Sequence, residues 1–96
     1  MEVILSPRRS GKTTRLIEQC AKDGGYIVSI SHAEAYRVAQ RAREMGLSIP
    51  FPLTPPEFVG KHYHGKVIKW FYIDNADMFL QSLTTIPIAT ITLTDR

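Results

Sequence analysis

Cysteine and long apolar runs are scarce in this sequence. Cys20 is the single cysteine among 96 residues, so a disulfide framework within the chain is excluded. A lone cysteine fits a reducing, intracellular setting. No apolar stretch approaches the about 20 residues that a membrane-spanning helix requires, and the first residues pass from a short apolar run straight into a charged segment, unlike a signal peptide. We therefore expect a cytoplasmic protein that does not associate with membranes.

Neither sign of charge dominates the composition. The chain has 12 Lys and Arg against 9 Asp and Glu, a net charge of +3, with 44% hydrophobic residues. This balance is ordinary for a globular protein, and the length suits one small domain spanning residues 1–96. The mild positive excess is compatible with a polyanionic partner but does not require one.

The most informative segment follows the apolar residues Val3-Ile4-Leu5. It reads Ser6-Pro7-Arg8-Arg9-Ser10-Gly11-Lys12-Thr13-Thr14. This is the Walker A pattern, GxxxxGK[ST], with a serine where the first glycine is usual. In such a segment a strand ends, the chain wraps around an anion and a helix begins, so that backbone N–H groups point at phosphates. The alternative is a chance match in a basic turn between a strand and a helix.

Each residue type that this pattern requires serves a chemical purpose. Gly11 lets the backbone approach a phosphate closely, since it has no Cβ. Lys12 supplies a mobile positive charge for the β- and γ-phosphates. Thr13 offers a hydroxyl to Mg²⁺. We therefore predict that residues 6–14 bind a nucleoside triphosphate, expected to be ATP, together with Mg²⁺. Arg8 and Arg9 either add charge beside the triphosphate, reach as an arginine finger into a neighbouring subunit, or face solvent on a tight turn.

Apolar patterning predicts strands that alternate with helices. The expected strands are 2–5, 26–30, 67–73 and 86–93, and the expected helices are 11–22, 32–45 and 76–83. Ser31, with Glu34 three residues later, predicts an N-cap, and Thr54 is expected to cap a single turn. Such alternation implies a mostly parallel sheet, so we expect one small three-layer α/β/α domain with a four-stranded sheet.

The third expected strand ends Trp70-Phe71-Tyr72-Ile73-Asp74, which is the Walker B pattern. Asp74 would hold Mg²⁺ through its water shell. Many ATPases have a glutamate at the next position to orient or deprotonate the attacking water, but this chain has Asn75. Asparagine holds a water and cannot take its proton. Asp77 either positions that water instead or is a first-turn carboxylate that favours the following helix.

Taken together, these motifs resemble the P-loop NTPases, and in particular the ATPase core of viral large terminase subunits and of helicase-like proteins. The resemblance implies the sheet order first, fourth, third, second. It also implies Mg²⁺-dependent NTP hydrolysis linked to nucleic acid in a viral or mobile-element setting. The chain departs from that family by lacking a fifth strand, an Asp-Glu pair and a second domain, which counts against a complete motor.

Partners are less clearly indicated by the sequence. Basic residues that could contact DNA or RNA are Lys61, Lys66, Lys69, Arg37, Arg41 and Arg43. A solvated charged surface is the alternative interpretation. A single domain without its own arginine finger would gain one by assembling, so a homo-oligomer or a larger protein partner is also a hypothesis.

Three functions remain open at this stage. The first is hydrolysis of a nucleoside triphosphate, with Lys12, Asp74, Asn75 and Asp77 as the catalytic candidates. The second is a catalytically weak nucleotide-binding module that regulates a protein partner, which Asn75 favours. The third is a small nucleoside or nucleotide kinase, for which the proline-rich segment 47–60 is the available room for a lid.

Overall fold

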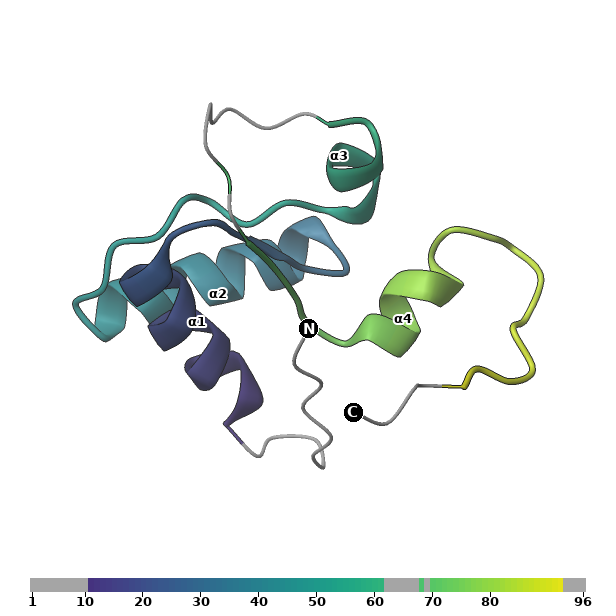
Figure 1. Cartoon of the computed structure of the whole chain (residues 1–96), viewed down its shortest axis with the longest axis horizontal. Coiled ribbons are helices and arrows are strands. Elements are labelled where there is room, and N and C mark those ends of the chain that lie inside the picture. The colour runs from purple at the N-terminus through teal and green to yellow at the C-terminus, as the bar shows by residue number, and fades with distance from the viewer. Residues whose placement is uncertain (1–10, 62–67, 69, 93–96) are drawn as a thin grey trace.

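The computed structural model describes residues 11–61, 68 and 70–92 (Figure 1). Its elements are, in order, α1 (Lys12–Asp23), β1 (Tyr26–Val28), α2 (His32–Glu44), α3 (Pro55–Val59), β2 (Phe71–Ile73) and α4 (Ala76–Gln81). The two strands pair in parallel, with Tyr26 opposite Phe71 and Val28 opposite Ile73. In the described part of the chain, no helix has the length and apolar character needed to cross a membrane.

The prediction of a four-stranded, three-layer α/β/α domain is wrong. The described residues form one two-stranded sheet, whose strands fall within the expected ranges 26–30 and 67–73. The expected strand 2–5 lies outside the described residues, so the sheet order first, fourth, third, second has no counterpart. β1 is buried on both faces as expected, but Phe71 and Ile73 of β2 are 36% and 39% exposed.

The expected strand 86–93 fails for a local reason, which is visible in its described residues 86–92. The side-chain amide of Gln81 donates to the carbonyl of Ile86 at 2.9 Å, and its oxygen accepts from the N–H of Ile88 at 2.7 Å. Pro87, between them, has no N–H to donate. A side chain of α4 therefore takes the backbone groups that a neighbouring strand would otherwise use, and residues 86–92 are exposed and irregular.

Local signals set the helix boundaries close to where the sequence predicted them. The Ser31 hydroxyl accepts from the N–H of Glu34 at 3.2 Å and caps α2. The N–H and hydroxyl of Thr54 both donate to the Glu57 carboxylate, at 2.9 and 2.8 Å, and begin the short helix α3. Gly46, just beyond α2, has φ of 71°, a left-handed conformation that ends the helix.

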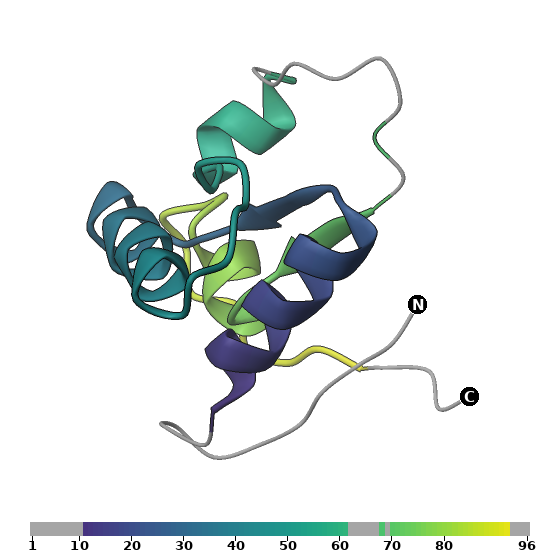
Figure 2. The same cartoon turned by 90° about the vertical axis from the view of Figure 1, so that its left-hand side faces the viewer.

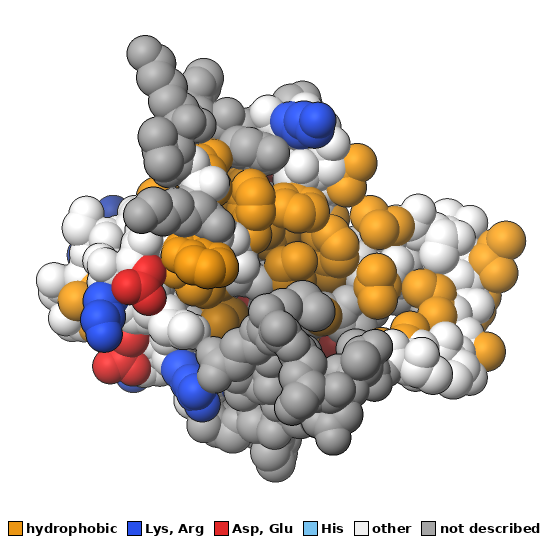
Figure 3. All heavy atoms as spheres, in the orientation of Figure 1, with side chains coloured by type: hydrophobic (Ala, Val, Ile, Leu, Met, Phe, Trp, Pro, Cys, Tyr) orange, Lys and Arg blue, Asp and Glu red, His pale blue; other side chains and the backbone are white. Residues whose placement is uncertain are grey.

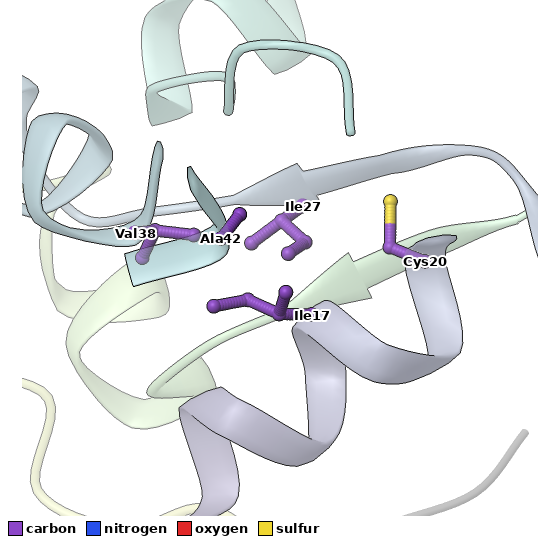
Figure 4. Close-up of a cluster of buried hydrophobic side chains, with 5 residues drawn as sticks. All are labelled: Ile17, Cys20, Ile27, Val38 and Ala42. Carbon is purple, nitrogen blue, oxygen red and sulfur yellow. The ribbon is translucent and has the colours of Figure 1, made fainter. Parts of the chain in front are cut away.

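The hydrophobic core lies where α1 and α2 meet one face of the strand pair (Figure 4). It is formed by Ile17, Cys20, Ile27, Val38 and Ala42, each no more than 2% exposed. Tyr72, which pairs with Ile27, packs against the same cluster. Cys20 is the small buried side chain that its helical spacing predicted, and burial raises the pKa of its thiol. In the view turned by 90°, α1 crosses in front of the strand pair (Figure 2).

Aromatic rings join the opposite face of β2 to α3 and α4. Phe58 of α3 makes edge-to-face contacts with Phe71 at 4.9 Å and with Phe79 of α4 at 5.6 Å between ring centroids. Figure 3 shows hydrophobic side chains gathered over the middle of one face of the molecule. The outer edge of β1 is covered by Leu53, whose N–H donates to Ile27 and whose carbonyl accepts from Ser29.

The glycine at the start of β1 provides a test of the strand pairing. Gly25 has φ of 101°, and a Cβ at this position would lie 2.2 Å from the backbone oxygen of Trp70. Gly25→Ala should therefore lower the free energy of unfolding by about 3 kcal/mol. Gly46→Ala is the matched control, because Gly46 also has positive φ but open space around it, and it should cost about 1–2 kcal/mol. Urea denaturation measures both, and equal losses would contradict the close approach of the two strands.

Candidate functional site

Two polar residues follow the two strands directly and lie side by side. Ser29 comes after Val28, Asp74 comes after Ile73, and Val28 is paired with Ile73. Side chains alternate along a strand, so Ser29 and Asp74 point to the same face as Ile27 and Tyr72. That face is the one covered by α1 and α2. The carboxyl end of the sheet therefore presents a hydroxyl and a carboxylate toward the helices.

The first turn of α1 meets Asp74 directly. The Thr13 hydroxyl donates a hydrogen bond of 3.1 Å to Oδ2 of Asp74, across 61 residues of sequence. Asp74 is only 5% exposed, and its backbone N–H donates to the carbonyl of Val28 at 3.1 Å. The threonine of the Walker A pattern and the aspartate of the Walker B pattern are therefore in contact, as the hypothesis of a shared metal site requires.

Two buried oxygens at this edge have no hydrogen-bond partner among the described residues. They are Oδ1 of Asp74 and Oγ of Ser29, which is 2% exposed. A buried polar atom without a partner destabilises a fold by about 1–3 kcal/mol. Such atoms are uncommon in native proteins and call for an explanation, of which an ion or water at the site is one.

The electrostatic surroundings of Asp74 identify its charged neighbours. Burial raises the pKa of the Asp74 carboxyl, and the Glu34 carboxylate raises it further. The Thr13 hydrogen bond, the Lys12 ammonium and a hydrogen bond from the backbone N–H of Asn75 lower it. Burial is the largest of these effects, so the pKa of Asp74 lies above its ordinary value. Lys12 and Glu34 both lie close enough to Asp74 to act on it.

The N-terminus of α1 leaves its backbone donors available. Gly11, with φ of 85°, begins the helix, and no side chain of the described residues caps it. The first turn of α1 also has no acidic residue. The N–H groups of a first turn have no partner within the helix, and the helix dipole adds partial positive charge there. This end of α1 therefore favours an anion.

An open groove of about 420 Å³ runs from this point between α1 and α2. Its lining consists of Thr13, Thr14, Glu34, Arg37, Val38, Gln40, Arg41 and Glu44. Arg37 forms an ion pair with Glu34, and Arg41 lies 3.9 Å from Glu44. The basic and acidic side chains of the groove are therefore already paired along α2.

The structure brings together some of the predicted site residues and separates others. Gly11, Lys12 and Thr13 lie at the same edge as Asp74, whereas residues 6–10 lie outside the described part of the chain. Asn75 has φ of 55° and begins α4. Asp77 is exposed in the first turn of α4 and lines a different groove with Met78, Gln81 and Ile88.

The predicted nucleic-acid surface is described only in part. Lys61 is exposed, and Lys66 and Lys69 lie outside the described residues. Of the three arginines of α2, Arg37 and Arg41 have glutamate partners on the same helix. A neighbouring carboxylate offsets part of the positive charge of each of these arginines, so this surface is less basic than the three arginines alone suggest.

Sequence reasoning missed two residues of this site. The sequence pattern places Ser29 in a strand and Glu34 in a helix cap. The signal for both was their position just after β1, because the carboxyl ends of neighbouring parallel strands meet at one edge. Pairing of β1 with β2 brings the Ser29 hydroxyl and the Glu34 carboxylate to the edge where Asp74 lies.

The oxygens at this edge fit Mg²⁺. Carboxylate and hydroxyl oxygens are the hard ligands that Mg²⁺ prefers, and nucleotide sites use one or two of them together with water and phosphates. The described residues contain no group of three or more His, Cys, Asp or Glu side chains arranged to hold a metal. A Mg²⁺ site that also uses the phosphates of a nucleotide does not need three such side chains.

Comparisons of this chain with family models, curated proteins and solved structures give no match. Its function is therefore inferred from the chemistry of its own side chains.

The raised pKa of Asp74 predicts how stability depends on pH without divalent cations. The folded state holds its proton more tightly than the unfolded chain, so the free energy of unfolding should fall as pH rises from the ordinary value of 3.8 through the folded pKa. Asp74→Asn should lack this fall. Urea denaturation in EDTA between about pH 4 and 8 measures it.

The matched control is Asp77→Asn, because Asp77 is an exposed carboxylate close by in sequence. This variant should keep the dependence of the parent protein. A parent protein whose stability rises with pH over this range, relative to Asp74→Asn, would contradict the buried environment of Asp74.

Proposed function

We propose that this chain binds a magnesium nucleoside triphosphate at the carboxyl edge of its strand pair and hydrolyses the bond between the β- and γ-phosphates. The observation that carries the proposal is the 3.1 Å hydrogen bond between Thr13 and the buried Asp74. The sequence motifs that contain these two residues are each associated with a nucleotide and its metal. Their contact supports a shared role, because they come from distant parts of the chain.

Phosphate binding is assigned to the first turn of α1. Its N–H groups supply directional hydrogen bonds to phosphate oxygens, and the helix dipole adds to the attraction. Lys12 lies close enough to Asp74 to lower the pKa of that carboxyl. Its ammonium therefore belongs to the same site and would neutralise the outer phosphates.

The metal is assigned to the oxygens of Thr13 and Asp74. A bound Mg²⁺ would supply positive charge to the oxygens of the β- and γ-phosphates. The Thr13 hydroxyl, which now donates to Asp74, would turn its lone pair to the metal. Oδ1 of Asp74 and Oγ of Ser29, buried without partners in the described structure, would accept from or donate to the water shell of the ion.

A second candidate function is nucleotide binding without turnover, in a module that regulates a partner. Two observations favour it. Asn75 stands where many ATPases have a catalytic glutamate. Asp77, the nearby carboxylate, lines a groove that does not contain Thr13. The two candidates share the binding site and differ in whether phosphate is released.

Lysine 12 provides the direct test of the proposal. We expect the protein to bind Mg-ATP or Mg-GTP, and Lys12→Ala to weaken binding at least about 10-fold, because a charge facing the outer phosphates is lost. Isothermal titration calorimetry measures the affinity, and a phosphate-release assay with and without single-stranded and duplex DNA measures turnover.

Lys22→Ala is the matched control, since Lys22 is an exposed lysine in the last turn of the same helix. It should bind as the parent protein does. Absence of binding heat for both nucleotides at millimolar concentration, or equal losses in the two lysine variants, would overturn the proposal. Binding without phosphate release would select the second candidate function.

A further inference from the structure

Helix α2 fixes the position of Glu34 at the edge of the site. It lies in the first turn of α2, where its N–H donates to the Ser31 hydroxyl at 3.2 Å. α2 begins at His32, shortly after β1 ends at Val28. Its first turn is therefore at the same carboxyl edge as Ser29 and Asp74.

The Glu34 side chain faces the first turn of α1. It lines the groove between α1 and α2 together with Thr13 and Thr14, and its side chain is 29% exposed. An ion pair with Arg37 restricts its orientation. Its carboxylate also acts electrostatically on Asp74. Glu34 is therefore a partly exposed carboxylate beside the proposed metal position, where water has access.

Three other described acidic residues, Asp74, Asp77 and Glu44, are less well placed. Asp74 is buried and hydrogen-bonded to Thr13, and it is the proposed ligand of the metal. Asp77 lines a different groove. Glu44, the second carboxylate of the α1–α2 groove, ends α2 and lies about 15 Å farther along the helix, at 1.5 Å per residue.

We propose that Glu34 is the general base of this site. It would perform the task of the glutamate that many ATPases have at the position of Asn75. This inference rests on the proposed nucleotide hydrolysis. A water held by the Glu34 carboxylate in the groove beside Thr13 attacks the γ-phosphorus. A new oxygen–phosphorus bond forms, and the bond from that phosphorus to the β–γ bridging oxygen breaks.

The electron pair of the broken bond leaves with the nucleoside diphosphate. The proton of the attacking water passes to the Glu34 carboxylate and then to solvent, and the products are inorganic phosphate and the nucleoside diphosphate. Arg37 is a positioning residue in this scheme, because it contacts Glu34 and orients its carboxylate. General-base catalysis of this kind contributes about 10²- to 10⁴-fold to a rate.

The test is Glu34→Gln, which keeps the backbone N–H that Ser31 accepts and nearly the same side-chain shape. We expect its affinity for Mg-ATP to stay within about 2-fold of the parent protein, while kcat for phosphate release falls roughly 10²-fold or more.

Two control variants separate catalysis from structure. Glu44→Gln removes a carboxylate that lines the same groove and lies near an arginine of the same helix, and it should leave kcat unchanged. Arg37→Gln breaks the ion pair with Glu34 but keeps the base, so it should lower kcat by less than Glu34→Gln does. Retained affinity for Mg-ATP shows in each case that the variant is folded.

Each remaining outcome decides against the inference in a distinct way. Turnover by Glu34→Gln at more than about half the parental rate, or an equal loss in Glu44→Gln, would overturn the role of Glu34 and leave the proposed hydrolase intact. Loss of turnover in Asp77→Asn alone would transfer the role to Asp77. A parent protein that binds nucleotide without releasing phosphate contradicts general-base catalysis but not nucleotide binding, and one that binds no nucleotide overturns both proposals.

Discussion

Parallel pairing of β1 with β2 is the constraint on which the rest of this structure depends. The pairing joins Tyr26–Val28 to Phe71–Ile73, two segments that are far apart in sequence. Because the strands run in the same direction, whatever follows each of them meets at one edge. Asp74 thereby comes beside Ser29, and α1 and α2, which pack on the same face, bring Thr13 and Glu34 to that edge.

The buried polar atoms at the carboxyl edge of the strand pair lower the stability of the fold. A small domain buries a modest core, and here two buried oxygens without described partners lie next to that core, one of them on a carboxylate whose charged form is disfavoured by burial. A ligand that binds the folded state alone stabilises it by mass action. The proposed magnesium nucleotide would therefore satisfy these oxygens and raise the stability of the domain at the same time.

The two helix N-termini at this edge give it a mixed electrostatic character. The partial positive charge at the start of α1 meets no acidic side chain in its first turn and favours phosphate. The start of α2 carries Glu34 in its first turn. The start of α1 therefore favours an anionic ligand, and the start of α2 places a carboxylate beside that position. This arrangement can hold a water molecule next to a bound phosphate.

The sequence by itself determined the features whose partners lie within a few residues. The caps at Ser31 and Thr54, the end of α2 at Gly46 and the buried face of α1 through Ile17 and Cys20 follow from local spacing, and the structure agrees with each. The caps and the helix end are contacts between neighbours in the chain. The helical spacing of Ile17 and Cys20 marks the apolar face of α1, which then packs against residues distant in sequence.

Only the tertiary structure decided how many strands there are and which carboxylate lies at the site. Residues 86–92 are rich in β-branched side chains, but a strand requires a distant partner, and no described strand pairs with them. The backbone groups of Ile86 and Ile88 bond instead to Gln81, which is close by in sequence. Glu34 fits a helix cap by its spacing, and its proximity to Thr13 and Asp74 exists only because two distant strands pair. Strand partners and site neighbours are long-range contacts, and a local pattern does not specify them.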